Sequence, residues 1–245
     1  MGAADGRMVR AFRARDGGGL DRGRWPATVP AIAQLFESGF EVPPGVTVLV
    51  GENGSGKSTM LELFAESYGL NPQGGSRGAQ YRTRSSEPGL GRELTVHRGP
   101  HRPGWSYFIR ADTMHGLYSY LEDNPGKGPE SRYHELSHGE GFLALLASRA
   151  REPGFYLMDE PDAPLSFTSC LGLVALLYEL ARAGSQVVLA THSPVLAATP
   201  GATVQELGPW GIRPSTWDDL ELVRSWRRFL STPDAFLHHL ADEQE

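Results

Sequence analysis

The segment that most constrains the fold is residues 51–59, which read Gly-Glu-Asn-Gly-Ser-Gly-Lys-Ser-Thr. They fit the pattern G-x-x-x-x-G-K-[ST] at every position. The run of β-branched and apolar residues at 46–50 predicts a strand buried on both faces. Apolar residues at helical spacing follow the motif and end at Gly69, which predicts a helix. A strand, a glycine loop and a helix in this order form a phosphate-binding unit of an α/β protein.

Each position of this loop has a distinct predicted role in nucleotide binding. Glycines let backbone N–H groups surround a phosphate, and the helix that follows presents its positive N-terminus. Lys57 reaches the β- and γ-phosphates as a flexible cation, and the Ser58 hydroxyl completes a Mg²⁺ shell. Of the 23 basic residues 21 are arginines, so a lysine retained at position 57 fits a site where a planar guanidinium does not. The predicted nucleotide-binding residues are Gly51, Asn53, Gly54, Ser55, Gly56, Lys57, Ser58 and Thr59.

A second acidic element lies at residues 155–161, where an apolar strand ends in Asp159, Glu160 and a proline. In a phosphate-loop fold we expect Asp159 to hold Mg²⁺ together with Ser58. Glu160 is then placed to orient or deprotonate an attacking water. The competing interpretation is an acidic helix start, because Asp162 and the neighbouring prolines suit an N-cap.

Composition excludes several classes of protein. A length of 245 residues with 21% charged and 40% apolar residues is ordinary for a globular domain. The net charge of −6 argues against a chain coated with basic surface. Cys170 is the single cysteine, so no disulfide forms within the chain, which favours a cytoplasmic location. No apolar run approaches the roughly 20 residues needed to span a bilayer.

The pattern predicts one α/β domain with a mostly parallel sheet, helices on both faces and a small antiparallel edge. We divide residues 1–245 into a nucleotide-binding start (8–70), an inserted lobe rich in Arg, Gly and Pro (71–135), a second core part (136–208) and a C-terminal helical tail (209–245). Strands are expected at residues 8–13, 46–50, 93–97, 107–110, 155–158, 186–191 and 203–207, and helices after residue 57, through 142–149 and at 168–183, 220–229 and 234–245.

Two further motifs identify a subclass. Leu136-Ser-His-Gly-Glu140 opens a predicted helix before the acidic strand, and Thr191-His-Ser193 ends the strand after it. With the phosphate loop, their order and spacing resemble the ABC-type (ATP-binding-cassette) ATPases of the P-loop NTPase fold. The resemblance implies that Ser137 and Gly139 reach the γ-phosphate of a second subunit, so that a homodimer sandwiches two ATP molecules. It also implies magnesium and water-activating roles for Asp159 and Glu160, and a γ-phosphate contact for His192.

A nearer resemblance is to a group of stand-alone bacterial predicted ATPases. It is carried by Gly-Gly-Ser-Arg at 74–77, Arg-Ala-Asp-Thr at 110–113, Ser-His-Gly-Glu at 137–140, Thr-His-Ser-Pro-Val-Leu at 191–196 and Pro-Gly-Ala at 200–202. The sequence departs from the wider ABC pattern in the signature itself, which has His138 and Glu140. The glutamine that usually couples magnesium to the helical lobe has only Gln80 as a weak candidate.

The resemblance leaves the partner open. One hypothesis is DNA repair, genome maintenance or defence, with DNA or a nuclease as partner. Its support is the soluble single cassette and seven arginines between residues 77 and 110, although arginine replaces lysine throughout this chain. The alternative is that the chain is the ATP-binding subunit of an ABC membrane transporter. A third possibility is that it acts on another soluble partner. In each case the expected activity is Mg²⁺-dependent ATP hydrolysis.

Overall fold

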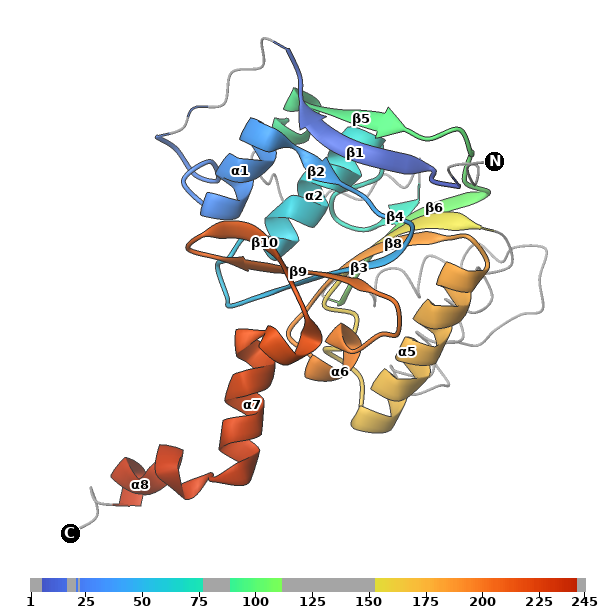
Figure 1. The fold of residues 1–245 in the computed structure, drawn as a ribbon. Helices are drawn as coiled ribbons and strands as arrows, with labels where there is room; N and C mark the ends of the chain where they lie inside the picture. Colours follow the sequence, from blue (N-terminus) through green and yellow to red (C-terminus); the bar gives the residue numbers. More distant parts are fainter. Residues whose placement is uncertain (1–5, 17–20, 22, 77–88, 112–152, 242–245) are drawn as a thin grey trace.

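The computed structural model describes residues 6–16, 21, 23–76, 89–111 and 153–241. A seven-stranded sheet forms the centre of the molecule, in the order β10-β9-β3-β8-β7-β6-β4 (Figure 1). Its five inner strands pair in parallel, and the two outer strands are antiparallel to their neighbours. The strands are β3 (Gly45–Gly51), β4 (Gly75–Ser76), β6 (Trp105–Arg110), β7 (Gly154–Asp159), β8 (Gln186–Thr191), β9 (Thr203–Gly208) and β10 (Gly211–Ser215).

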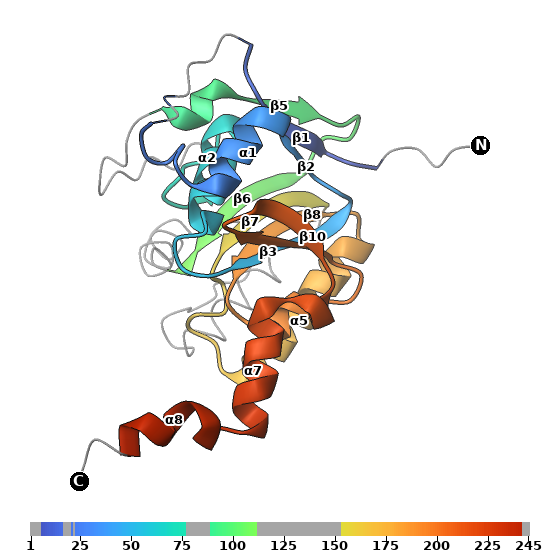
Figure 2. The same cartoon turned by 60° about the vertical axis from the view of Figure 1, so that its left-hand side comes forward.

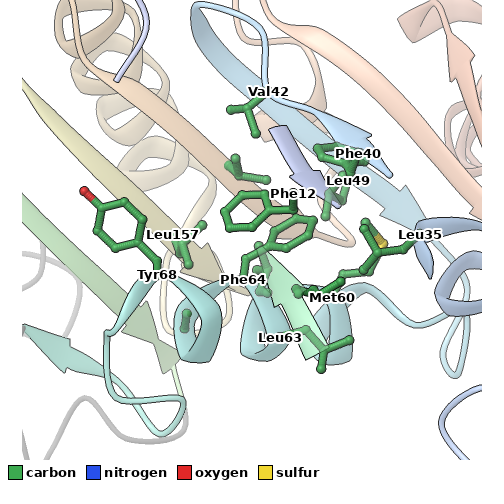
Figure 3. Packing of buried hydrophobic residues seen from close by; sticks show 14 of the residues in the cluster. Phe12, Leu35, Phe40, Val42, Leu49, Met60, Leu63, Phe64, Tyr68 and Leu157 are labelled. Carbon is green, nitrogen blue, oxygen red and sulfur yellow. The ribbon is translucent and has the colours of Figure 1, made fainter. Parts of the chain in front are cut away.

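One face of this sheet is covered by helices and by a second, antiparallel sheet of order β2-β1-β5. Helix α2 lies between the two sheets, and Phe64 on it stacks on Phe12 of β1 with ring centroids 4.1 Å apart (Figure 3). Burying such aromatic pairs contributes most of the packing energy of a layer like this. The elements of this layer are β1 (Val9–Ala14), α1 (Pro30–Ser38), β2 (Phe40–Glu41), α2 (Lys57–Tyr68), the 3₁₀ turn η1 (Leu90–Glu93) and β5 (Leu94–Arg98).

The opposite face is covered by α5, α6 and the start of α7, which pack on the apolar side chains of β3 and β8. Helices α7 and α8 then extend away from the body (Figures 1 and 2). Within the described residues, no helix has the length and apolar character to cross a membrane. The elements here are α5 (Phe167–Arg182), α6 (Pro194–Ala197), the 3₁₀ turn η4 (Trp217–Asp219), α7 (Glu221–Ser231) and α8 (Asp234–Ala241).

A buried glutamine joins the two sheets. The Gln186 side chain, at the start of β8, accepts hydrogen bonds from the backbone N–H groups of Met8 and Val9. Its amide nitrogen donates to the carbonyls of Val9, Val42 and Pro43. A side-chain amide can accept from backbone N–H groups and donate to backbone carbonyls at the same time. This one residue therefore holds the small sheet against the large one.

The α/β architecture predicted from the sequence is confirmed: a mostly parallel sheet, helices on both faces and an antiparallel edge. Seven expected strands are found within two residues of their bounds, α2 ends at Tyr68 directly before Gly69, and α5 matches the helix expected at 168–183 to within one residue. Residues 71–111, expected in the inserted lobe, contribute β4 and β6 to the large sheet and β5 to the small one. The expected helix through 142–149 lies outside the described residues, and the division into parts stays a prediction.

Candidate functional site

The phosphate loop connects the carboxyl end of β3 to the first turn of α2, as predicted. Gly56 precedes the helix with a φ of 100°, in the left-handed region that favours glycine. A Cβ on Gly56 would also lie 2.9 Å from a methyl carbon of Val29, just before α1. No side chain caps this end of α2, so the backbone N–H groups of its first turn remain for a ligand.

Lys57 is buried within the loop that it is predicted to serve. Its ammonium donates hydrogen bonds to the carbonyls of Gly51 (2.7 Å) and Glu52 (3.2 Å). Burial lowers the pKa of Lys57, while the carboxylates of Glu160 and Asp159 oppose that shift. The cation therefore lies inside the loop, on the side where the acidic strand ends.

Asp159, the last residue of β7, faces the start of α2. Its Oδ1 accepts a hydrogen bond from the Ser58 hydroxyl at 3.0 Å, which brings together the two residues predicted to hold magnesium. Burial raises the pKa of Asp159 to about 6, against the lowering effects of the Arg110 guanidinium and the Ser58 hydroxyl. A hydroxyl beside a buried carboxylate is the hard-oxygen donor set that Mg²⁺ prefers in nucleotide sites.

Glu160 and His192 lie on neighbouring loops, after β7 and β8, and approach to 3.7 Å between Oε1 and Nε2. In the described part of the chain, four buried side-chain polar atoms have no hydrogen-bond partner, and two of them, His192 Nε2 and Ser55 Oγ, lie at this site. Buried polar atoms are costly unless something pairs with them. These atoms at the loop and at the histidine therefore fit a site that receives the phosphates and metal of a nucleotide.

Arg110 is a site residue that sequence reasoning placed elsewhere, among the arginines considered for DNA. It is the last residue of β6, directly opposite Asp159 in the parallel register. Its guanidinium pairs with Glu62 on α2 and lies 3.9 Å from Asp159 Oδ2. With its side chain 15% exposed, Arg110 is a partner of the acidic residues at the site and not a surface contact.

A second missed pair is Asp162 with Thr191. The Thr191 hydroxyl donates to Asp162 Oδ1 at 2.6 Å and joins the loop after β7 to the loop after β8. The sequence alone offers Asp162 as a helix N-cap. That interpretation is wrong, because α5 begins at Phe167 and Ser166 caps it. The signal for Thr191 was its position next to His192.

The other described arginines of residues 77–110 have varied settings. Arg92 approaches Glu66, Arg98 lies over the ring of Tyr68 and Arg102 is exposed. The signature residues Ser137 and Gly139, the candidate Gln80, and Arg77, Arg82 and Arg84 all lie outside the described residues. The part of the chain that the structure describes holds no cluster of three or more metal-ligating side chains.

Comparisons with known proteins agree with this geometry. Residues 118–198 match the family described as "AAA domain, putative AbiEii toxin, Type IV TA system". The arabinose import ATP-binding protein AraG of Pseudomonas savastanoi is 27% identical over 190 residues, which are 66% of this chain and 36% of that protein. The ribose import ATP-binding protein RbsA 2 of Burkholderia pseudomallei is 30% identical over 196 residues, or 67% of this chain and 37% of that protein.

Among solved structures, the fold is similar to "an inward-facing conformation of a putative metal-chelate type ABC transporter". The TM-score is 0.51 at 17% identity, covering 87% of this chain and 84% of that one. Together these similarities support an ABC-type P-loop ATPase domain in this chain. The ABC-type domain spans about a third of the length of the curated relatives that it matches.

Proposed function

We propose that this ABC-type domain binds ATP with Mg²⁺ and hydrolyses its terminal phosphoanhydride bond. The observation that carries the proposal is the meeting of Lys57, the Ser58–Asp159 hydrogen bond and the Glu160–His192 pair where β3, β7 and β8 end. Ligands of open α/β sheets bind at this edge, beyond the carboxyl ends of the strands.

The residues divide the work. The first turn of α2 and Lys57 hold the phosphates, and Ser58 with Asp159 would hold Mg²⁺, whose charge supports the leaving phosphate. Glu160 accepts a proton from water, because its side chain is 44% exposed whereas that of Asp159 is 8% exposed. His192, 3.7 Å from Glu160, supplies a hydrogen bond on the phosphate side.

The test compares the two lysines of the chain. Lys57→Ala removes the buried ammonium and should lower nucleotide affinity and turnover at least about 100-fold, since charge-assisted phosphate contacts are strong. Lys127→Ala is the matched control and should retain both. Binding is measured with a fluorescent ATP analogue and turnover by phosphate release. Unchanged hydrolysis by Lys57→Ala would rule out this site.

We further propose that hydrolysis takes place in an ATP-dependent homodimer, which would bring Ser137 and Gly139 of one copy to the nucleotide of the other. Glu160→Gln keeps the shape of the side chain but cannot accept the proton, so nucleotide binding persists while turnover falls about 100-fold or more. Size-exclusion chromatography with light scattering should show this variant as a dimer with ATP and as a monomer without it. A monomer at saturating ATP would contradict the proposed dimer but not the proposed ATP hydrolysis.

The comparisons and the structure support two candidate processes that ATP hydrolysis could drive. A transporter subunit is supported by the curated relatives, which are named as sugar-import ATP-binding proteins. A role in genome maintenance or defence, with DNA or a nuclease as partner, is supported by the matched family's description as part of a toxin–antitoxin system and by exposed Arg102. Of the four described arginines of that segment, Arg92, Arg98 and Arg110 contact residues of their own chain, which weakens the DNA hypothesis.

The two partners give different stimulation of ATP turnover. Turnover is measured with duplex DNA at low and high salt, and with candidate transmembrane subunits in detergent. Salt-sensitive stimulation by DNA supports the genome-maintenance role, because phosphate contacts weaken steeply with salt. Stimulation by a transmembrane subunit without an effect of DNA supports transport.

A further inference from the structure

Glu160 has an unusual backbone conformation. Its φ is 49°, and among the described residues it is the one non-glycine residue with a positive φ. The left-handed region costs an L-residue on the order of 1–2 kcal/mol. Such strain persists only where the surroundings hold it, and it occurs often at functional sites. Some contact must therefore hold the loop that carries Glu160.

The backbone supplies part of that hold. The Glu160 N–H donates to the carbonyl of Ala190 on β8, and the Ala163 N–H donates to the carbonyl of Glu160, each at 3.0 Å. Backbone bonds of this kind form with any side chains. They hold the turn against the end of β8 through backbone atoms alone.

The side-chain link between the two loops is the Thr191–Asp162 hydrogen bond. Thr191 is fully buried, and its hydroxyl both donates to Asp162 Oδ1 at 2.6 Å and accepts from the Ser193 N–H at 2.9 Å. Only a hydroxyl can fill both roles at this size. Burial raises the pKa of Asp162 while the bond from Thr191 opposes that shift, so the bond lies in a desolvated setting where hydrogen bonds are strong.

We propose that Thr191 and Asp162 are positioning residues that hold Glu160 and His192 in register for ATP hydrolysis. One loop carries Glu160 two residues before Asp162, and the other carries His192 directly after Thr191. The bond between Thr191 and Asp162 therefore sets the 3.7 Å approach of Glu160 and His192. Among the described hydrogen bonds, neither side chain bonds to the phosphate loop, so we expect the pair to act on turnover and not on nucleotide affinity. This inference rests on the proposed ATPase function.

The test separates turnover from binding. Thr191→Val keeps the shape of the side chain and removes the hydroxyl. We expect kcat to fall about tenfold or more, since small displacements of reacting groups cost that much, with KM and the Kd for a fluorescent ATP analogue unchanged. Thr191→Ser restores the hydroxyl and should keep kcat within about twofold. Wild-type kcat in Thr191→Val, or an equal loss in Thr191→Ser, would overturn the proposal.

A second pair of variants covers the case in which Thr191→Val does not fold. Asp162→Asn retains the Oδ1 acceptor and should keep most of the turnover, whereas Asp162→Ala removes the acceptor and should behave like Thr191→Val. Equal turnover in Asp162→Asn and Asp162→Ala would overturn the positioning role. A wild-type protein that binds nucleotide but does not hydrolyse it would instead overturn the proposed ATPase function, so the two failures are distinguishable.

Discussion

The edge where β3, β7 and β8 end differs sharply from the C-terminal arm formed by α7 and α8. At the edge, ionisable side chains are buried: Lys57 is 5% and Asp159 is 6% exposed. On the arm, large apolar side chains face water: Trp226 is 47% and Leu230 is 71% exposed. Each region therefore reverses the usual distribution of polar and apolar groups in a folded protein.

The two reversals are stabilised in different ways. At the edge, each buried charge has a specific partner, such as Ser58 for Asp159 and Glu62 for Arg110. On the arm, apolar rings contact one another, with the ring centroids of Phe229 and Phe236 5.8 Å apart, and Val223 at the base of α7 is buried in the core. We therefore expect changes at the edge to have large, coupled effects, and changes along the arm to have small ones.

The largest effect is expected from Arg110→Gln. It removes the cation between two acids and leaves the buried Asp159 close to the partly exposed Glu62 without a positive charge between them. Breaking a buried ion pair on one side costs about 3–5 kcal/mol, so the free energy of unfolding should fall by that order. Denaturant unfolding in the presence of EDTA measures it.

The matched control is Arg98→Gln, which removes a neighbouring arginine that lies over the ring of Tyr68. An exposed cation–π contact contributes about 0.5–1 kcal/mol. Combining Arg110→Gln with Glu62→Gln should recover part of the loss, because it removes one of the two unpaired acids. An equal loss in the Arg98 and Arg110 variants would show that the edge is not held by its charge pairs.

Sequence reasoning succeeded where local chemistry is strict and failed where function depends on pairing across strands. The phosphate loop and the Asp159–Glu160 pair follow from motifs whose spacing the chemistry requires, and the structure brings Ser58 to Asp159 as predicted. Arg110 joins the site through the register of β6 against β7, which no short motif encodes. The helix α1 was missed because it is nine residues long, which is short for a periodic pattern, and no glycine-loop motif precedes it as one precedes α2.

Asp159→Asn should act in the opposite direction and stabilise the fold. The pKa of Asp159 is about 6 in the folded chain, above its ordinary value of 3.8, so folding favours the protonated form. Its contribution to stability is therefore complete below pH 3.8 and lost as the pH rises through about 6. At pH 8 the neutral amide should stabilise the protein by about 1–3 kcal/mol.

The pH dependence separates this effect from a packing effect. The advantage of Asp159→Asn in thermal unfolding, measured in EDTA, should shrink steadily between pH 7 and pH 4 as Asp159 itself becomes protonated. Nucleotide-dependent magnesium binding should be lost at every pH, because the substitution removes the carboxylate that would hold the metal. The variant would then be more stable and less active. A stability gain of Asp159→Asn that does not change with pH would mean that ionisation of Asp159 does not destabilise the folded protein. The edge would then resemble an ordinary exposed surface.

The smallest effect is expected on the arm, from Leu230→Ser. Leu230 is 71% exposed, so the substitution removes little buried apolar area and should change the free energy of unfolding by less than about 0.5 kcal/mol. Val223→Ser at the base of the same helix is the control. Val223 is 2% exposed. Its replacement by serine should lower the free energy of unfolding by about 2–3 kcal/mol, because the substitution removes buried apolar area and introduces a hydroxyl into the core. Denaturant unfolding of both variants locates the point along α7 where the core ends. Equal losses would mean that the distal half of α7 is buried in solution, and the contrast between the arm and the edge would disappear.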